Sequence, residues 1–95
     1  MTKVIQTILV RKPDDWHLHL RKGHILKKVL KYSSSNFGRA IIMPNLDPPV
    51  VTTQQAKNYC NQILDLIPKE HDFKPLMTLF LTEDSDIRDI EEGIK

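Results

Sequence analysis

The sequence predicts an α/β fold in which parallel strands alternate with helices. Short apolar runs bounded by loops recur along the 95 residues, and amphipathic stretches separate them. Polar side chains suited to ligand binding follow two of these runs, as they do at the carboxyl ends of strands in parallel sheets. The expected order is one strand followed by three strand–helix units. This order fits both a doubly wound sheet and a (β/α)8 barrel.

The stretch Asp14–Arg21 carries the strongest functional signal. In an extended strand His17 and His19 project from one face, because successive side chains alternate. Two neutral imidazoles at a strand end can hold one divalent cation such as zinc. Arg21 keeps the same parity and offers a guanidinium fork suited to a substrate carboxylate. The residues between them are expected to face a core: Trp16, Leu18 and Leu20. A half-exposed strand with two polar positions is the alternative interpretation of the histidine pair.

The first third of the chain also predicts three structural segments. β-branched and apolar residues indicate a strand over Val4–Val10, which ends before Pro13. After Gly23, helical spacing of apolar residues predicts a helix from about His24 to Ser33. The lysines between those apolar positions form its expected solvated face: Lys27, Lys28 and Lys31. The cluster at residues 33–36, together with Gly38, predicts a loop.

The middle of the chain predicts a central strand and a long helix. Ala40–Met43 is apolar on both faces, which suits an inner strand of a parallel sheet. The loop Pro44–Pro49 is stiff, because its three prolines fix φ. Thr52 and Gln55 stand in capping-box spacing. An amphipathic stripe follows them and ends at Pro68: Ala56, Tyr59, Cys60, Ile63, Leu64 and Ile67.

The last part of the chain predicts one more strand and one more helix. The apolar run Leu76–Leu81 lies within 73–81 and indicates the strand, and Ser85 with Asp86 indicates a helix start before Ile87, Ile90 and Ile94. We find no internal repeat and no internal domain boundary in residues 1–95. A (β/α)8 barrel needs about 250 residues. The chain would supply about three of its eight units, so it looks like the front of a larger protein, and in the barrel case residues 1–95 are one N-terminal fragment of the domain.

Composition excludes several classes of partner. A net charge of +2 with interspersed acidic and basic residues argues against nucleic acid and against an acidic membrane surface. One cysteine, Cys60, rules out an internal disulfide and is expected to be a buried, inert thiol. The chain has neither a long apolar run nor the apolar core of a signal peptide, so a cytoplasmic protein is expected.

With these motifs placed, the chain resembles the N-terminal portion of a dihydroorotase of the single-function bacterial class, within the amidohydrolase superfamily. The combination of His-x-His-x-Arg with Met-Pro-Asn about two dozen residues later carries the resemblance, whereas His-x-His alone is shared by many amidohydrolases. The resemblance runs over nearly the whole chain, and its matching stretches are Asp14–Arg21, Gly38–Leu46, Pro48–Val50 and Pro75–Thr78.

The resemblance implies roles for four residues. His17 and His19 correspond to ligands of the more buried of two zinc ions, and His19 also to a substrate contact. Arg21 and Asn45 correspond to the residues that bind the substrate carboxylate. Taken without the resemblance, Asn45 is better interpreted as a loop residue bonded to its own backbone. Lys22 departs from the pattern, because the family usually carries an acidic residue there.

The implied reaction is the reversible cyclisation of N-carbamoyl-L-aspartate to L-dihydroorotate in pyrimidine synthesis, by a protein that is a homodimer when full-length. Two further residues are expected beyond Lys95: a carbamylated lysine that bridges the two zinc ions, and a general-base aspartate. No catalytic residue is therefore assigned, and the 95 residues alone are predicted to be inactive. Lys95 ends a predicted helix and is a poor candidate for that lysine. His24 and His71 are expected to be solvent-exposed.

Two alternatives remain open at this point. One is a non-catalytic, dihydroorotase-like scaffold in a pyrimidine-pathway complex. The other is a different cyclic-amide hydrolase, of the hydantoinase or allantoinase type.

Overall fold

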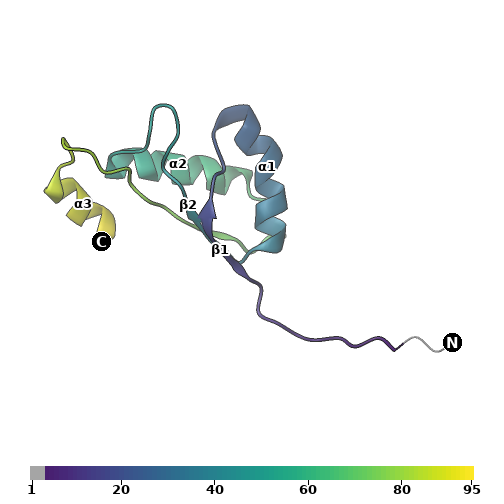
Figure 1. Cartoon of the computed structure of the whole chain (residues 1–95). Coiled ribbons are helices and arrows are strands. Elements are labelled where there is room, and N and C mark those ends of the chain that lie inside the picture. The colour runs from purple at the N-terminus through teal and green to yellow at the C-terminus, as the bar shows by residue number, and fades with distance from the viewer. Residues whose placement is uncertain (1–3) are drawn as a thin grey trace.

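The computed structural model describes residues 4–95, which form three strand–helix units. The three strands make one parallel sheet in the order β1-β2-β3, and each strand is followed by a helix (Figure 1). The prediction of parallel strands alternating with helices is confirmed, and the arrangement is that of part of a (β/α)8-type barrel. The elements in chain order are β1 (Asp14–Leu18), α1 (Gly23–Asn36), β2 (Arg39–Ile42), α2 (Thr53–Leu66), β3 (Lys74–Leu76) and α3 (Ile87–Ile94).

The register of the sheet brings the ends of β1 and β2 together. Leu18 pairs with Ile42, the last residue of each strand, and the Met43 N–H donates to the Leu18 carbonyl at 2.9 Å. The pairing shifts between Asp15 and Leu18, so β1 carries an irregularity beside the histidines. Because the strands are parallel, the loops that follow β1 and β2 leave the sheet at the same edge (Figure 1).

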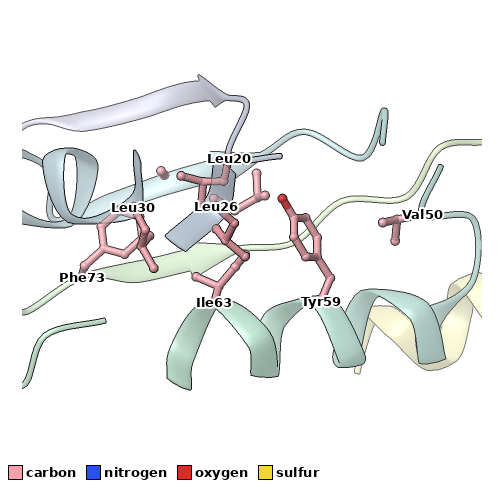
Figure 2. Close-up of a cluster of buried hydrophobic side chains, with 9 residues drawn as sticks. Leu20, Leu26, Leu30, Val50, Tyr59, Ile63 and Phe73 are labelled. Carbon is pink, nitrogen blue, oxygen red and sulfur yellow. The ribbon is translucent and has the colours of Figure 1, made fainter. Parts of the chain in front are cut away.

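The hydrophobic core lies between the sheet and the helices α1 and α2. Alternate residues of β2, Ala40 and Ile42, are fully buried, while each helix contributes side chains one turn apart (Figure 2). β2 is the central strand, as its apolar sequence predicted. The core consists of Leu20, Leu26, Leu30, Ala40, Ile42, Val50, Tyr59, Ile63 and Phe73.

Helix α2 begins with the predicted capping box. The Gln55 N–H donates to the Thr52 hydroxyl at 3.1 Å, and the Gln55 side chain accepts from the Thr52 N–H at 3.1 Å. Each bond satisfies a backbone donor that the first helical turn leaves without a partner. The helix ends at Leu66, two residues before Pro68, as the sequence predicted.

The prediction of a strand over Val4–Val10 is wrong. The segment is extended and unpaired, and its large side chains are at least 78% exposed. β-branched residues favour a strand only where a neighbouring strand completes the hydrogen bonds and covers one face. No strand among residues 4–95 lies beside this segment, which runs away from the body of the fold (Figure 1).

Two other boundaries differ from the sequence prediction. The cluster at residues 33–36 is the last turn of α1, not a loop, and its polar side chains bond within the helix: Ser35 Oγ and Asn36 Nδ2 both donate to the Tyr32 carbonyl. The third strand is Lys74–Leu76, upstream of most of the apolar run. Beyond it the chain stays near β2 through a bond from the Thr78 hydroxyl to the Ile42 carbonyl, without a strand ladder.

Two side chains also differ from expectation. Trp16 was expected in the core but is 54% exposed, because β1 is an outer strand of the described sheet; the Arg39 guanidinium lies over its ring at 5.2 Å. His71 was expected in solvent but is half-buried, with Nδ1 2.7 Å from the Ser34 hydroxyl. His24 is exposed as expected. Within residues 4–95 no helix has the length and hydrophobicity needed to cross a membrane.

Candidate metal and substrate site

The two histidines of the Asp14–Arg21 stretch converge. The Nε2 atoms of His17 and His19 lie 3.0 Å apart, and the rings meet at 60° with their centroids 4.9 Å apart. His17 is exposed and His19 is half-buried. The spacing of two residues along an extended chain has placed both imidazoles toward one point, as the sequence predicted.

Local hydrogen bonds fix the backbone that carries the histidines. The Asp15 carboxylate accepts from the His17 N–H at 3.0 Å. At the start of the strand, Asp14 accepts from the guanidinium of Arg39 at 2.7 Å and from that of Arg11 at 3.1 Å. The hydrogen bond from Arg39 lowers the pKa of the Asp14 carboxyl, and the positive charge of Arg11 adds to the effect. Asp14 therefore stays ionised and ties β1 to β2.

The histidine pair fits a zinc ion. Zinc binds imidazole nitrogen at about 2.0–2.1 Å, so two ligands of a tetrahedral ion stand about 3.3 Å apart. The Nε2 separation of 3.0 Å between His17 and His19 is within a few tenths of an ångström of that value. Among residues 4–95 no group of three or more His, Cys, Asp or Glu side chains gathers into a cluster that could hold an ion. The described chain thus offers two of the usual four ligands.

Arg21 lies beyond the end of β1, in the loop before α1. Its backbone is in the left-handed region, with φ of 60°, which is uncommon for a residue with a side chain. Its direction is therefore set by this loop conformation and not by the alternation of a strand. The guanidinium is exposed and forms no ion pair with any residue in the described range 4–95.

Asn45 occupies the equivalent position after β2. It stands three residues beyond Ile42, as Arg21 stands three residues beyond Leu18, and these two strand residues are paired. The loop is closed by the Pro44 carbonyl, which accepts from the N–H groups of Leu46 and Val50, both at 2.9 Å. The side chain of Asn45 is exposed, and no hydrogen bond from it occurs within residues 4–95. The interpretation of Asn45 as a side chain bonded to its own backbone is not supported.

Two contacts that the sequence did not predict connect these loops to the fold. The Lys22 ammonium donates to the Asp47 carbonyl and joins the loop after β1 to the loop after β2. The Tyr59 hydroxyl, from α2, donates to the Arg21 carbonyl. In the sequence, Tyr59 belongs only to an amphipathic stripe, and the one signal for this contact is that a buried tyrosine hydroxyl needs a polar partner. The structure thus gathers the histidine pair at one point and places Arg21 and Asn45 after the carboxyl ends of β1 and β2, with no hydrogen bond between those two side chains in the described range.

The single thiol is not part of this site. Cys60 lies on α2, half-buried, and burial raises the pKa of its thiol. A thiol with a raised pKa is a poor nucleophile and a poor metal ligand at neutral pH. This agrees with the inert role predicted for Cys60.

The architecture is that of a segment of a parallel α/β barrel, and solved dihydroorotase structures share this fold. The chain is similar to a dihydroorotase from Campylobacter jejuni, with 38% identity and a TM-score of 0.78 over 86% of this chain and 24% of that one. It is also similar to a dihydroorotase from Saccharomyces cerevisiae, solved with 5-fluoroorotic acid, with 32% identity and a TM-score of 0.75 over 85% of this chain and 22% of that one. No family model matches the chain.

The resemblance to the N-terminal portion of a dihydroorotase is therefore confirmed, and the chain is dihydroorotase-like in sequence and in fold. It spans about a quarter of the length of the solved dihydroorotases that it matches.

Proposed function

We propose that this chain contributes the first metal ligands and the carboxylate-binding residues of a zinc-dependent dihydroorotase. The observation that carries the proposal is the convergence of His17 and His19, with Nε2 atoms 3.0 Å apart, on the sheet edge where Arg21 and Asn45 follow β1 and β2. The similarity to two dihydroorotases supports the reaction class, which is the reversible cyclisation of N-carbamoyl-L-aspartate to L-dihydroorotate.

Each residue has a defined task in this proposal. His17 and His19 would hold zinc, which would supply Lewis-acid activation of the ring amide and of water. His19, the more buried of the two, also lies against the substrate. Arg21 and Asn45 bind the substrate carboxylate, because a guanidinium fork and an amide donor together fix an anion in one orientation. The yeast relative was solved with 5-fluoroorotic acid, a ligand that also carries a ring carboxylate.

The remainder of the site must come from other residues. A structural or catalytic zinc site uses three or four protein ligands, and the described range 4–95 gathers no set of three. We propose that a bridging carbamylated lysine, further histidines and an aspartate that moves the proton are supplied outside these 95 residues. The 95-residue chain alone is then inactive.

The experiment that tests the function measures zinc content and turnover of dihydroorotate in the native protein that carries this sequence. We expect about two zinc ions per chain and activity that a chelator abolishes and zinc restores. Hydantoin and allantoin are the matched alternative substrates. Faster turnover of either one than of dihydroorotate would show that the protein is another cyclic-amide hydrolase and not a dihydroorotase. A protein with neither zinc nor turnover would instead be an inert scaffold.

A further inference from the structure

The loop that presents Arg21 holds a conformation that its sequence does not favour. Arg21 has φ of 60°, and Gly23, two residues later, has φ of 56°. Glycine adopts this region freely, but an arginine does so only when the surroundings hold it there. Because φ sets the direction of Cβ from the main chain, whatever fixes φ also fixes where the guanidinium can reach.

The contacts that hold Arg21 come from both sides of its peptide. Leu20, immediately before it, is 1% exposed and anchors the chain in the core. The carbonyl of Arg21 accepts a hydrogen bond from the hydroxyl of Tyr59. Tyr59 is itself 4% exposed, and in Figure 2 its oxygen points away from α2 toward the sheet side of the core, where Leu20 and Leu26 lie. The Arg21 peptide is thus fixed at a buried residue and at a buried hydroxyl.

The hydroxyl of Tyr59 is suited to be a permanent donor. Burial raises the pKa of Tyr59 to about 12, against the opposing influence of the Arg21 positive charge. The phenol therefore keeps its proton throughout the neutral range. A buried hydroxyl without a hydrogen-bond partner is unfavourable. The bond therefore satisfies the Tyr59 hydroxyl and the Arg21 carbonyl together.

We propose that Tyr59 is a positioning residue: its hydroxyl holds the Arg21 backbone in the left-handed conformation and thereby sets the guanidinium for the substrate carboxylate. This inference rests on the carboxylate-binding role proposed for Arg21. It adds a residue on α2, outside the two loops of the site. The competing explanation is that the ring of Tyr59 only fills the core, as another aromatic residue would.

The variant Tyr59→Phe separates these explanations, because it keeps the ring and removes only the hydroxyl. The matched control is Tyr32→Phe, the same chemical change at an exposed tyrosine on α1. In the native protein, we expect Tyr59→Phe to raise KM for dihydroorotate about tenfold, the size of effect that one lost hydrogen bond gives. We expect kcat to stay within about twofold, zinc content to be unchanged and Tyr32→Phe to behave as wild type.

Other kinetic results would overturn the proposal. An unchanged KM in Tyr59→Phe, with or without a lower melting temperature, would mean that the ring acts only in the core. A fall in kcat together with a loss of zinc would mean that the side chain acts through the metal site instead.

A second measurement distinguishes failure of this inference from failure of the proposed function. Trypsin cuts after arginine and lysine in loops that can open, so the rate of cleavage at Arg21 and Lys22 reports how firmly the loop is held. If the wild-type protein does not turn over dihydroorotate, the proposed function fails and the trypsin rates decide the role of Tyr59. Faster cleavage in Tyr59→Phe than in wild type and Tyr32→Phe supports it, and equal rates overturn it.

Discussion

The Nε2 atoms of His17 and His19 lie 3.0 Å apart at the carboxyl end of β1. Two ring nitrogens this close face one common point, and a cation between the rings would accept a lone pair from each of them. A bound zinc ion satisfies both nitrogens at once, and this gives the pair a measurable signature in metal content.

Replacing one histidine tests that signature. We expect His17→Ala and His19→Ala each to remove one of two zinc ions from the native protein and to lower turnover by at least about 100-fold, since even the partners that orient zinc ligands contribute 10–100-fold. Zinc is measured by elemental analysis beside initial rates. The control is His24→Ala, at the exposed histidine of α1. Full zinc content in both variants would show that the pair does not bind the ion.

The guanidinium fork of Arg21 is tested by a change that keeps its charge. We expect Arg21→Lys to raise KM for dihydroorotate about 10- to 100-fold, because a charge-assisted hydrogen bond contributes about 1.5–3 kcal/mol. Steady-state kinetics measure this, with Arg88→Lys on α3 as the control at an exposed arginine. An unchanged KM in Arg21→Lys would show that Arg21 contributes only its positive charge to substrate binding.

Asp14 gives the fold a dependence on acid. Its pKa is lowered in the folded state by the hydrogen bond from Arg39, followed by the charges of Arg39 and Arg11. A group with a lowered pKa stabilises the fold above its unfolded value, about 3.9, and loses this contribution as the pH falls through the lower folded value. We expect the urea concentration at the unfolding midpoint to decrease as the pH is lowered below about 4. The decrease should be less steep in Asp14→Asn.

The matched control for this change is Asp84→Asn, at an exposed carboxylate in the loop before α3. The acid dependence of this variant should match that of wild type. An identical dependence in Asp14→Asn would show that the ion pair with Arg39 is not coupled to folding.

The elements that the sequence predicted well are those whose signal is local. The start of α2 follows from the reciprocal bonds of Thr52 and Gln55, and β2 follows from an apolar run too short for a helix. Val4–Val10 failed because a strand needs a partner, and β-propensity says nothing about whether a partner is present. Period and capping are properties of a segment, whereas strand pairing is a property of the fold.

In the candidate site, too, the features set by local sequence were predicted and those set by distant contacts were not. The spacing of His17 and His19 was enough to predict their convergence, because both follow one extended backbone. Arg21 was predicted on the same strand parity, but β1 ends at Leu18 and the conformation of Arg21 depends on Tyr59, 38 residues away. A left-handed non-glycine residue held by a distant hydroxyl leaves no pattern in the local sequence.

The bond between Ser34 and His71 is another such distant contact, and it gives the last prediction. Ser34 is 0% exposed, and its hydroxyl lies 2.7 Å from Nδ1 of His71 in the loop before β3, so it joins the last turn of α1 to that loop. We expect Ser34→Ala to lower the free energy of unfolding by about 1 kcal/mol, the usual net value of such a bond, and more if Nδ1 is left without water.

Urea denaturation measures this, with Ser35→Ala as the control one residue along the helix. The hydroxyl of Ser35 is exposed and bonds only within its own helix, to the Tyr32 carbonyl at 3.2 Å, so its removal should change the free energy much less. Equal effects of the two substitutions would mean that the contact between α1 and the His71 loop does not contribute to stability.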